Sequence, residues 1–407
     1  MLPMALLKLN RGYPMTFSLD QLAIAYSNQL WLEFSPKDQE EALPLDQDYS
    51  HNAARWHAYL NRLCLNILVP ELQQEAQLKH LPQAWPHPAA LPSIWEVVNG
   101  TAITLDQTRI VIIPSVTIDT EEFCVPSEWV DIPSFAADYY LAVQVNHYDG
   151  WLRVWGFTTY RKIKHEGKYD PSDRTYSLEP EDLFENLNVL WVAKELCPES
   201  KAKIQPLPKL SPTQAQRLLA KLGQPSPYSP RLFVGFAQWG ALLEHGGWRQ
   251  RLYQQRQGLK EQWSILEWLQ TDVSDFARQM GWALVSVQPS WSGAKGAELT
   301  QAPAVRVLLR QLLIAGQHYS LRVARIGSSE QRTWRFELRS SYSGGRIPGG
   351  MKLRLLTEDL QTFLNNEALA ATAVDQLYVE VELEPGEGLV WETEPIPENY
   401  EREILRF

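Results

Sequence analysis

The alternation of apolar and polar residues in the last third of the chain constrains the fold more than any other feature. Five stretches after position 304 carry apolar residues at every second position, and clusters of Gly, Ser and Pro separate them. Successive side chains of a strand point to opposite faces of a sheet, so this period indicates strands with one face in a core. We predict an antiparallel β-sandwich with strands at 305–309, 319–326, 334–338, 351–355 and 377–383.

The first half of the chain changes from helical to strand spacing. Apolar residues between positions 53 and 68 recur with the period of an α-helix, which Pro70 is expected to kink or end. Two hairpins follow, 102–105 with 109–113 and 139–145 with 151–157. The last of these strands is apolar on both faces, which is typical of a small barrel or of a sheet packed against helices.

Proline density predicts where the halves are joined. Seven prolines lie between Pro198 and Pro230, around a helix at 212–222, and further helices are predicted at 237–245 and 259–280. A chain of 407 residues is long enough for two or three domains. We therefore predict an α+β fold in four segments. These are a helix-plus-barrel domain at 1–198 (with 1–14 disordered or foreign to the native protein), a linker at 199–230, a helical segment at 231–280 and the sandwich at 281–407.

Composition excludes several classes of protein. The net charge is −10, which disfavours condensation on phosphate backbones. Three scattered cysteines, Cys64, Cys124 and Cys197, do not form a disulfide framework or a zinc motif. The sequence contains neither a signal-peptide pattern nor an apolar stretch of membrane-spanning length. We expect a cytoplasmic protein without a membrane partner, a cofactor, a metal or a motif-bearing catalytic residue.

Positive charge gathers on the predicted sandwich. Residues 305–354 contain nine Arg and one Lys against two Glu. If residues 305, 307 and 309 point inward, alternation turns seven basic side chains outward. This candidate binding face consists of Arg306, Arg310, Arg322, Arg335, Arg339, Lys352 and Arg354.

The same face has a purely structural interpretation. Glu380, Glu382 and Glu384 alternate with inward apolar residues, so they form an acidic row on another strand. Neighbouring strands would place the two rows side by side as ion pairs, which we expect for some of these residues. Binding of nucleic acid or of an acidic partner through the Arg-rich face is the alternative.

Three other motifs favour structural roles. SGGRIPGGMKL (343–353) lacks the GK[ST] and the helix of a phosphate loop, so it is interpreted as a strand connection. EHGGWRQR (244–251) is interpreted as a helix stop, because the sequence contains no GxSxG elbow to complete an esterase. The clusters around Asp119, Glu121, Glu122 and Asp173 could serve a metal-assisted hydrolase, although Asp-Pro-Ser-Asp is equally typical of a turn.

Several longer phrases resemble a known family. LPSIWEVVNGTAITL, VPSEWVDIPSFAADYYLAVQV, WGALLEHGGWRQRLYQQRQGL and EPGEGLVWETEPIPENYEREILRF are similar to a cyanobacterial family catalogued as a domain of unknown function, number eighteen twenty-two in that series. The likeness runs from about Trp56 to the last residue. It implies a cyanobacterial cytoplasmic protein and supplies no activity, cofactor or site residue.

These observations favour a non-catalytic interaction or regulatory module with a protein partner. Nucleic-acid or acidic-partner binding through the Arg-rich face is one alternative, and an unrecognised metal-assisted hydrolase is another. Catalytic residues converge in space rather than in sequence, so the hydrolase stays open at this point.

Overall fold

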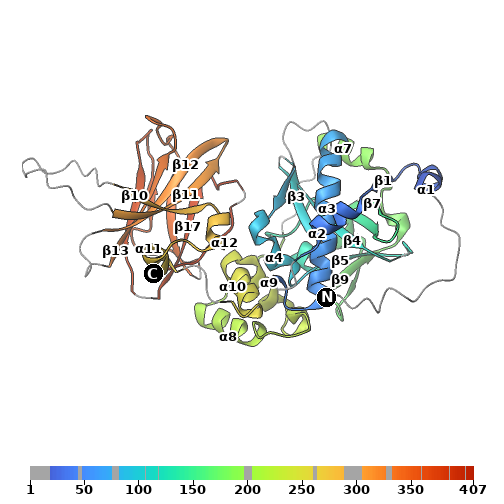
Figure 1. Cartoon of the computed structure of the whole chain (residues 1–407), viewed down its shortest axis with the longest axis horizontal. Coiled ribbons are helices and arrows are strands. Elements are labelled where there is room, and N and C mark those ends of the chain that lie inside the picture. Colours follow the sequence, from blue (N-terminus) through green and yellow to red (C-terminus); the bar gives the residue numbers. More distant parts are fainter. Residues whose placement is uncertain are drawn as a thin grey trace, which may run out of the picture.

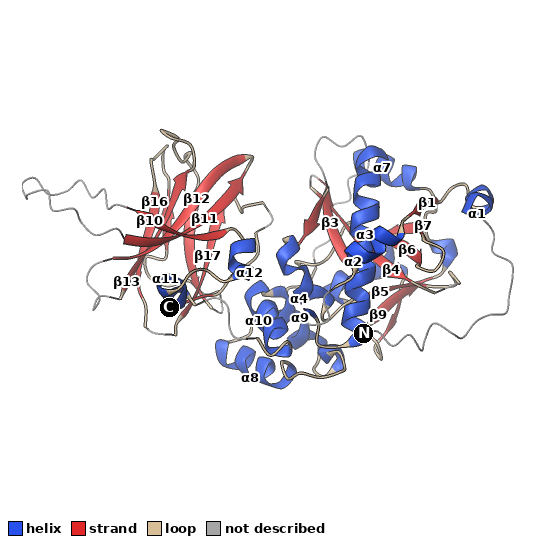
Figure 2. Ribbon diagram, viewed as in Figure 1, coloured by secondary structure: helices blue, strands red, loops and turns tan. Residues whose placement is uncertain are grey.

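A computed structural model describes residues 19–44, 48–75, 82–105, 107–117, 119–196, 204–259, 264–287, 305–326, 332–358, 360–384, 386–398 and 400–407. The expectation about residues 1–14 lies outside these ranges. Helices and sheets are both abundant, and most helices lie with the N-terminal half, while the C-terminal half is mainly strand (Figure 1, Figure 2). The predicted α+β class is confirmed.

A six-stranded sheet forms the centre of the N-terminal half. Its order is β1-β7-β6-β4-β3-β2, with β4 and β6 parallel and the other neighbours antiparallel. Both predicted hairpins are present, as β3–β4 and β6–β7, in an open sheet rather than a closed barrel. The strands are β1 (Leu30–Glu33), β2 (Gln83–Trp85), β3 (Thr101–Leu105), β4 (Thr108–Ser115), β6 (Tyr139–Asn146) and β7 (Trp151–Thr159).

Helices cover both faces of this sheet, which explains why its central strands are apolar on both sides. One face packs against α3 and α7 in a core that contains Leu63 and Leu141. The other face packs against α4, α5 and the later helices α8 to α10 in a core that contains Trp129, Tyr140 and Trp239. The covering helices are α3 (Asn52–Glu75), α4 (Leu91–Trp95), α5 (Glu128–Asp131), α7 (Leu187–Leu196), α8 (Pro212–Leu222), α9 (Phe236–Glu244) and α10 (Gly246–Arg256).

Of the two effects expected of Pro70, an end of the helix is wrong, because α3 continues to Glu75. Proline inside a helix removes one hydrogen bond and costs about 3 kcal/mol. Leu68 and Leu72 on either side of it are both fully buried. Burying a leucine stabilises by about 1.5–3 kcal/mol, so the packing of the two side chains offsets the proline.

The middle of the chain contains more helices than predicted. The predicted helices at 212–222 and 237–245 correspond to α8 and α9. The Gly246–Gly247 pair begins α10, which was not predicted, because the His245 ring caps it by accepting from Trp248 N. The predicted helix at 259–280 is two short helices, α11 (Ile265–Gln270) and α12 (Asp275–Gln279), whose N-caps are Ser264 and Ser274.

The C-terminal half is the predicted sandwich. One sheet has the order β10-β11-β12-β13-β16 and the other β15-β14-β17-β18, and their shared core contains Trp282, Phe336 and Trp391. SGGRIPGGMKL joins β13 to β14 and is a strand connection, as predicted. The strands are β10 (Trp282–Val287), β11 (Val305–Ile314), β12 (Gln317–Ile326), β13 (Thr333–Ser340), β14 (Lys352–Thr357), β15 (Glu367–Leu369), β16 (Leu377–Glu382), β17 (Gly388–Glu394) and β18 (Leu405–Arg406).

Candidate functional site

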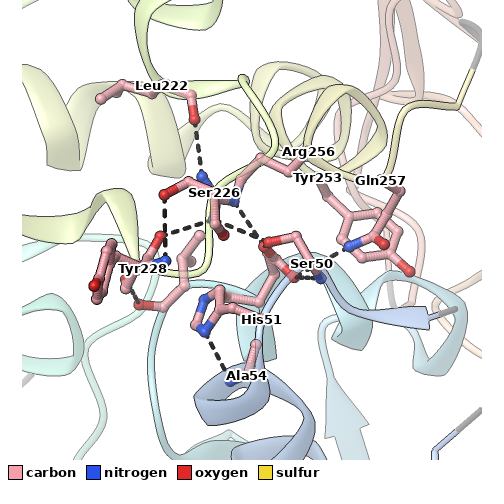
Figure 3. Close-up of polar contacts among 12 residues, drawn as sticks. Ser50, His51, Ala54, Leu222, Ser226, Tyr228, Tyr253, Arg256 and Gln257 are labelled. Carbon is pink, nitrogen blue, oxygen red and sulfur yellow. Dashed lines mark hydrogen bonds and ion pairs between the residues drawn. The ribbon is translucent and has the colours of Figure 1, made fainter. Parts of the chain in front are cut away.

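Arg256, at the end of α10, is the centre of a buried hydrogen-bond network (Figure 3). Its Nε donates to Oε1 of Glu96 at 2.7 Å, and both side chains are almost wholly excluded from solvent. Its Nη atoms donate at 2.9–3.4 Å to carbonyls at the end of α8 and in the loop after it, which fixes the path of that loop. The carbonyls belong to Leu222, Gln224, Ser226 and Tyr228.

The carboxylate of Glu96 is held from several elements at once. Its Oε2 accepts from Ser50 N at 3.1 Å and from Gln257 Nε2 at 3.2 Å. The His51 ring lies beside it, with Nδ1 accepting from Ala54 N at 3.2 Å and Nε2 donating to the Glu96 carbonyl at 3.1 Å. This is the neutral tautomer, and burial lowers the pKa of His51. A buried charge is tolerated only when it is paired and hydrogen-bonded, and Glu96 meets both conditions.

Two further arginines, Arg174 and Arg231, hold the other end of the same loop. Arg231 forms a bidentate ion pair with the fully buried Glu128, with Nε–Oε1 at 2.7 Å and Nη2–Oε2 at 2.8 Å. Trp239 Nε1 donates to the same carboxylate at 2.8 Å. Arg174 donates to the Arg231 carbonyl at 2.6 Å and to the Val234 carbonyl.

The loop between these anchors turns large apolar side chains outward. We name residues 224–235 the display loop. Tyr228 is 70% exposed, Leu232 48% and Phe233 52%, although the backbone that carries them is bonded to buried arginines. Exposed aromatic and aliphatic side chains on a fixed backbone are typical of protein-binding sites.

The exposed face of α8 beside the display loop is basic. Arg217 and Lys221 lie one turn apart on this face, and Lys221 Nζ donates to the Phe233 carbonyl at 3.3 Å. Residues 204–243 contain four basic residues and no acidic one, in a chain whose net charge is −10. This surface therefore combines apolar anchors with positive charge.

A cavity lies where the N-terminal sheet meets the C-terminal segment. Its volume is about 680 Å³, and its lining includes Asp138, Glu244, Glu392 and Glu401 with three arginines. Asp119, Glu121, Glu122 and Asp173, the carboxylates that the sequence offered for a hydrolase, do not line it.

Those four carboxylates are exposed on the surface. Glu122 and Asp173 both lie near Cys124, whose pKa is raised to about 12, first by burial and then by these two charges, so that its thiol stays protonated. Asp170 Oδ1 accepts from Ser172 N at 2.7 Å and Asp173 Oδ1 from Thr175 N at 3.1 Å. The Asp-Pro-Ser-Asp turn interpretation is thereby confirmed.

The predicted Arg-rich face is divided between the two sheets of the sandwich. Arg322, Arg335 and Arg339 lie on the outer face of the five-stranded sheet, whereas Lys352 and Arg354 lie on β14 in the other sheet. The seven residues of the candidate binding face therefore do not share one face. Lys352 and Arg354 lie within 3.4–3.7 Å of Glu367 and Glu394 on neighbouring strands.

The predicted pairing with an acidic row is confirmed for one of its three members. Arg335 Nε donates to Glu380 Oε1 at 2.8 Å, and the two residues are opposite each other in the β13–β16 register. Glu384 pairs instead with Arg332, and Glu382 is opposite Thr333. Arg322 and Glu337 are likewise opposite, and Arg339 pairs with Glu337.

The prediction that Arg310 points outward is wrong. Arg310 points into the sandwich and pairs with Glu403, with both side chains nearly inaccessible. Trp282 Nε1 donates to Glu403 Oε2 at 2.8 Å, and burial lowers the pKa of Arg310 to about 10. Arg306, four residues earlier on the same side of β11, is exposed and donates to carbonyls at the end of α11.

The site residues predicted from the sequence do not include Arg249 or Arg256, the second of which holds the display loop. A signal was present in α10, because Arg249 and Arg256 are seven residues apart and therefore share one helical face. Both are almost fully buried. Their partners Glu96 and Glu401 are more than 150 residues away along the chain, so no local pattern connects them.

Among the described residues, no helix combines the length and the apolar character that crossing a membrane needs. Within the same ranges, His, Cys, Asp and Glu side chains do not gather in a group of three that could hold a metal ion.

No curated protein and no solved structure matches this chain. One family does match, under the description "Protein of unknown function (DUF1822)", over residues 32–406. The match covers far more than half of the 407 residues and agrees with the phrases quoted from the sequence. The chain belongs to this family.

Proposed function

We propose that the protein is an interaction module that binds an acidic segment of a partner protein, with apolar side chains of that segment on the display loop. The observation that carries this proposal is the exposure of Tyr228, Leu232 and Phe233 on a backbone fixed by buried arginines. A backbone that is ordered before binding loses little conformational entropy when a partner covers the side chains that it carries.

Charge complementarity defines the partner. The display loop and α8 lie in a segment with four basic and no acidic residues. Arg217 and Lys221 would face carboxylates at the rim of the interface, where complementary charge favours the correct partner and accelerates association. The apolar anchors would occupy its centre.

Selection of random peptides on the immobilised full chain tests this proposal. The selected peptides are expected to combine Asp and Glu with Leu, Phe or Trp. Phe233→Ala should weaken their binding about thirtyfold, the effect of losing about 2 kcal/mol at a central anchor. Lys221→Glu should weaken binding and reduce its dependence on salt.

Matched controls come from elsewhere on the surface. Tyr148→Ala removes a tyrosine that is 74% exposed on the β6–β7 turn, and Lys37→Glu reverses an exposed charge on another helix. Neither should change binding. The proposal fails if selected peptides are basic, or if Phe233→Ala and Tyr148→Ala behave alike. Binding of single-stranded RNA in place of peptides, weakened by Lys221→Glu, would support the nucleic-acid alternative.

A further inference from the structure

The cavity is lined by both apolar and charged side chains. Trp85, Tyr160, Ile204 and Ile396 contribute rings and aliphatic groups, and the volume of about 680 Å³ suits a small organic molecule. The charged side chains come from three parts of the chain: β4 and the residue before β6, the helices α9 and α10, and β17 with the segment after it.

The three arginines of the lining are engaged within the protein. Arg249 pairs with Glu401 and also donates to Ser93 Oγ and the Leu243 carbonyl. Arg402 Nε lies 3.0 Å from Glu392 Oε1. The third guanidinium belongs to Arg109.

Arg109 is engaged by stacking and by a hydrogen bond. Its guanidinium lies 4.0 Å from the centre of the Trp85 ring and donates to the Ser134 carbonyl. Its main-chain N donates to Asp138 Oδ2 at 2.7 Å. Its charge is thus placed against a ring and a carbonyl, close to the Asp138 carboxylate.

Glu244, the last residue of α9, differs from Glu392 and Glu401 of the lining. Its carboxylate accepts a hydrogen bond from the Ser134 main chain and feels the more distant charge of Arg402. Within the described ranges neither Glu244 nor Asp138, which accepts from Arg109 N, has a salt bridge, whereas Glu392 and Glu401 each have one. Burial raises the pKa of Glu244, and the Ser134 hydrogen bond and Arg402 only partly oppose this. With four carboxylates and three guanidiniums, the lining has one more acidic than basic group.

We propose that this cavity binds a small aliphatic amine, whose ammonium group pairs with the Glu244 carboxylate and whose hydrocarbon part lies against the apolar lining residues. An ammonium supplies an ion-pair partner, which Glu244 lacks among the described residues, and further donors beside the Ser134 main chain. Ile204 and Ile396 provide aliphatic contact for the methylene groups. This site is separate from the display loop and does not depend on the function proposed for it.

Three four-carbon compounds test the charge that the cavity selects. Butane-1,4-diamine, butane-1,4-diol and succinate have the same chain length and differ in charge. Titration calorimetry with the full chain at neutral pH should show the diamine binding at least tenfold more tightly than the diol, because a charge-assisted hydrogen bond is stronger than a neutral one. Succinate should not bind.

Two variants test whether the diamine binds at Glu244. Glu244→Gln should weaken the diamine about tenfold or more, whereas Glu267→Gln, an exposed carboxylate on α11, should leave it unchanged. Equal diamine affinity in wild type and Glu244→Gln would overturn the proposal, as would tighter binding of succinate or the diol. An absence of diamine binding at millimolar concentration would also overturn it.

The folding of Glu244→Gln is itself predictable. A carboxyl group whose pKa is raised on folding favours the folded state when protonated, and this contribution is lost as pH rises from 4.5 through the raised pKa. The charged Glu244 therefore lowers the free energy of unfolding at pH 7. Without ligand, Glu244→Gln should be as stable as wild type or more so, which separates loss of binding from loss of fold.

Discussion

At the scale of single residues, buried arginines join segments that are far apart in the sequence. Arg174, Arg249 and Arg256 each donate to main-chain carbonyls in loops or at helix ends, where no regular secondary structure would satisfy them. Arg174 does this from a left-handed backbone conformation with φ of 58°. Such a conformation is costly for a residue with a side chain, and the two hydrogen bonds of Arg174 offset that cost.

Replacing Arg256 tests how much the fold depends on this arrangement. Arg256→Met should lower the free energy of unfolding by about 3–5 kcal/mol, because it leaves Glu96 charged and buried without its partner. The double variant Arg256→Met with Glu96→Gln should recover part of the loss. Arg278→Ala, which breaks an exposed pair on α12, should change stability by about 1 kcal/mol or less. Urea titration measures all three, and similar losses for Arg256→Met and Arg278→Ala would contradict the prediction.

At the scale of elements, strand β11 shows what sequence pattern can and cannot settle. Its sequence VRVLLRQLLI has apolar residues at both odd and even positions, so it fits either orientation. The prediction that residues 305, 307 and 309 point inward is wrong, because Leu308, Leu312 and Ile314 belong to the core. Arg310 shares their face, and the partner that neutralises it, Glu403, lies after the final long strand.

Elements that depend on residues close together in the sequence could therefore be predicted, whereas contacts between distant residues could not. The hairpins, the sandwich and helix α8 depend mostly on neighbours in sequence, and all three were predicted correctly. The display loop depends on Glu96 and Glu128, each more than 100 residues from the arginine that it holds. Glu244 has no motif around it, and its role in the cavity follows only from the side chains that it faces.

The boundary predicted at 199–230 can be compared with the packing of α8 to α10. Leu219, Trp239 and Leu252 share a core with Trp129 and Tyr140 of the N-terminal half. We therefore expect limited proteolysis to leave a C-terminal fragment that begins after α10 rather than near residue 231. N-terminal sequencing of the stable fragment distinguishes the two boundaries, and a start near residue 231 would support the proline-rich linker instead.

At the scale of the whole molecule, the two halves are joined by buried contacts. Trp248 Nε1 donates to Glu358 Oε1 at 3.1 Å, and the core of the N-terminal half includes Leu356, Val390 and Ile404 from the sandwich. Arg249 and Glu401 form a further link across this junction.

These links predict cooperative unfolding. Calorimetry of the wild type should show one transition, because separating the halves would expose buried apolar surface and leave the Arg249 charge unpaired. The double variant Glu358→Ala with Glu401→Ala should separate the two halves into distinct transitions. Two resolved transitions in the wild-type protein would contradict the prediction.

Residues 204–243, which include no Asp or Glu, make the distribution of charge along the chain uneven. Residues 204–243 contribute a charge of +4, and since the chain totals −10, the remaining residues carry −14. A protein with such a dipole turns in the field of an approaching charged body before the two surfaces touch. For an acidic partner, the positive patch would face forward while the rest of the surface is repelled. Added salt should then slow the encounter while leaving the lifetime of the complex almost unchanged.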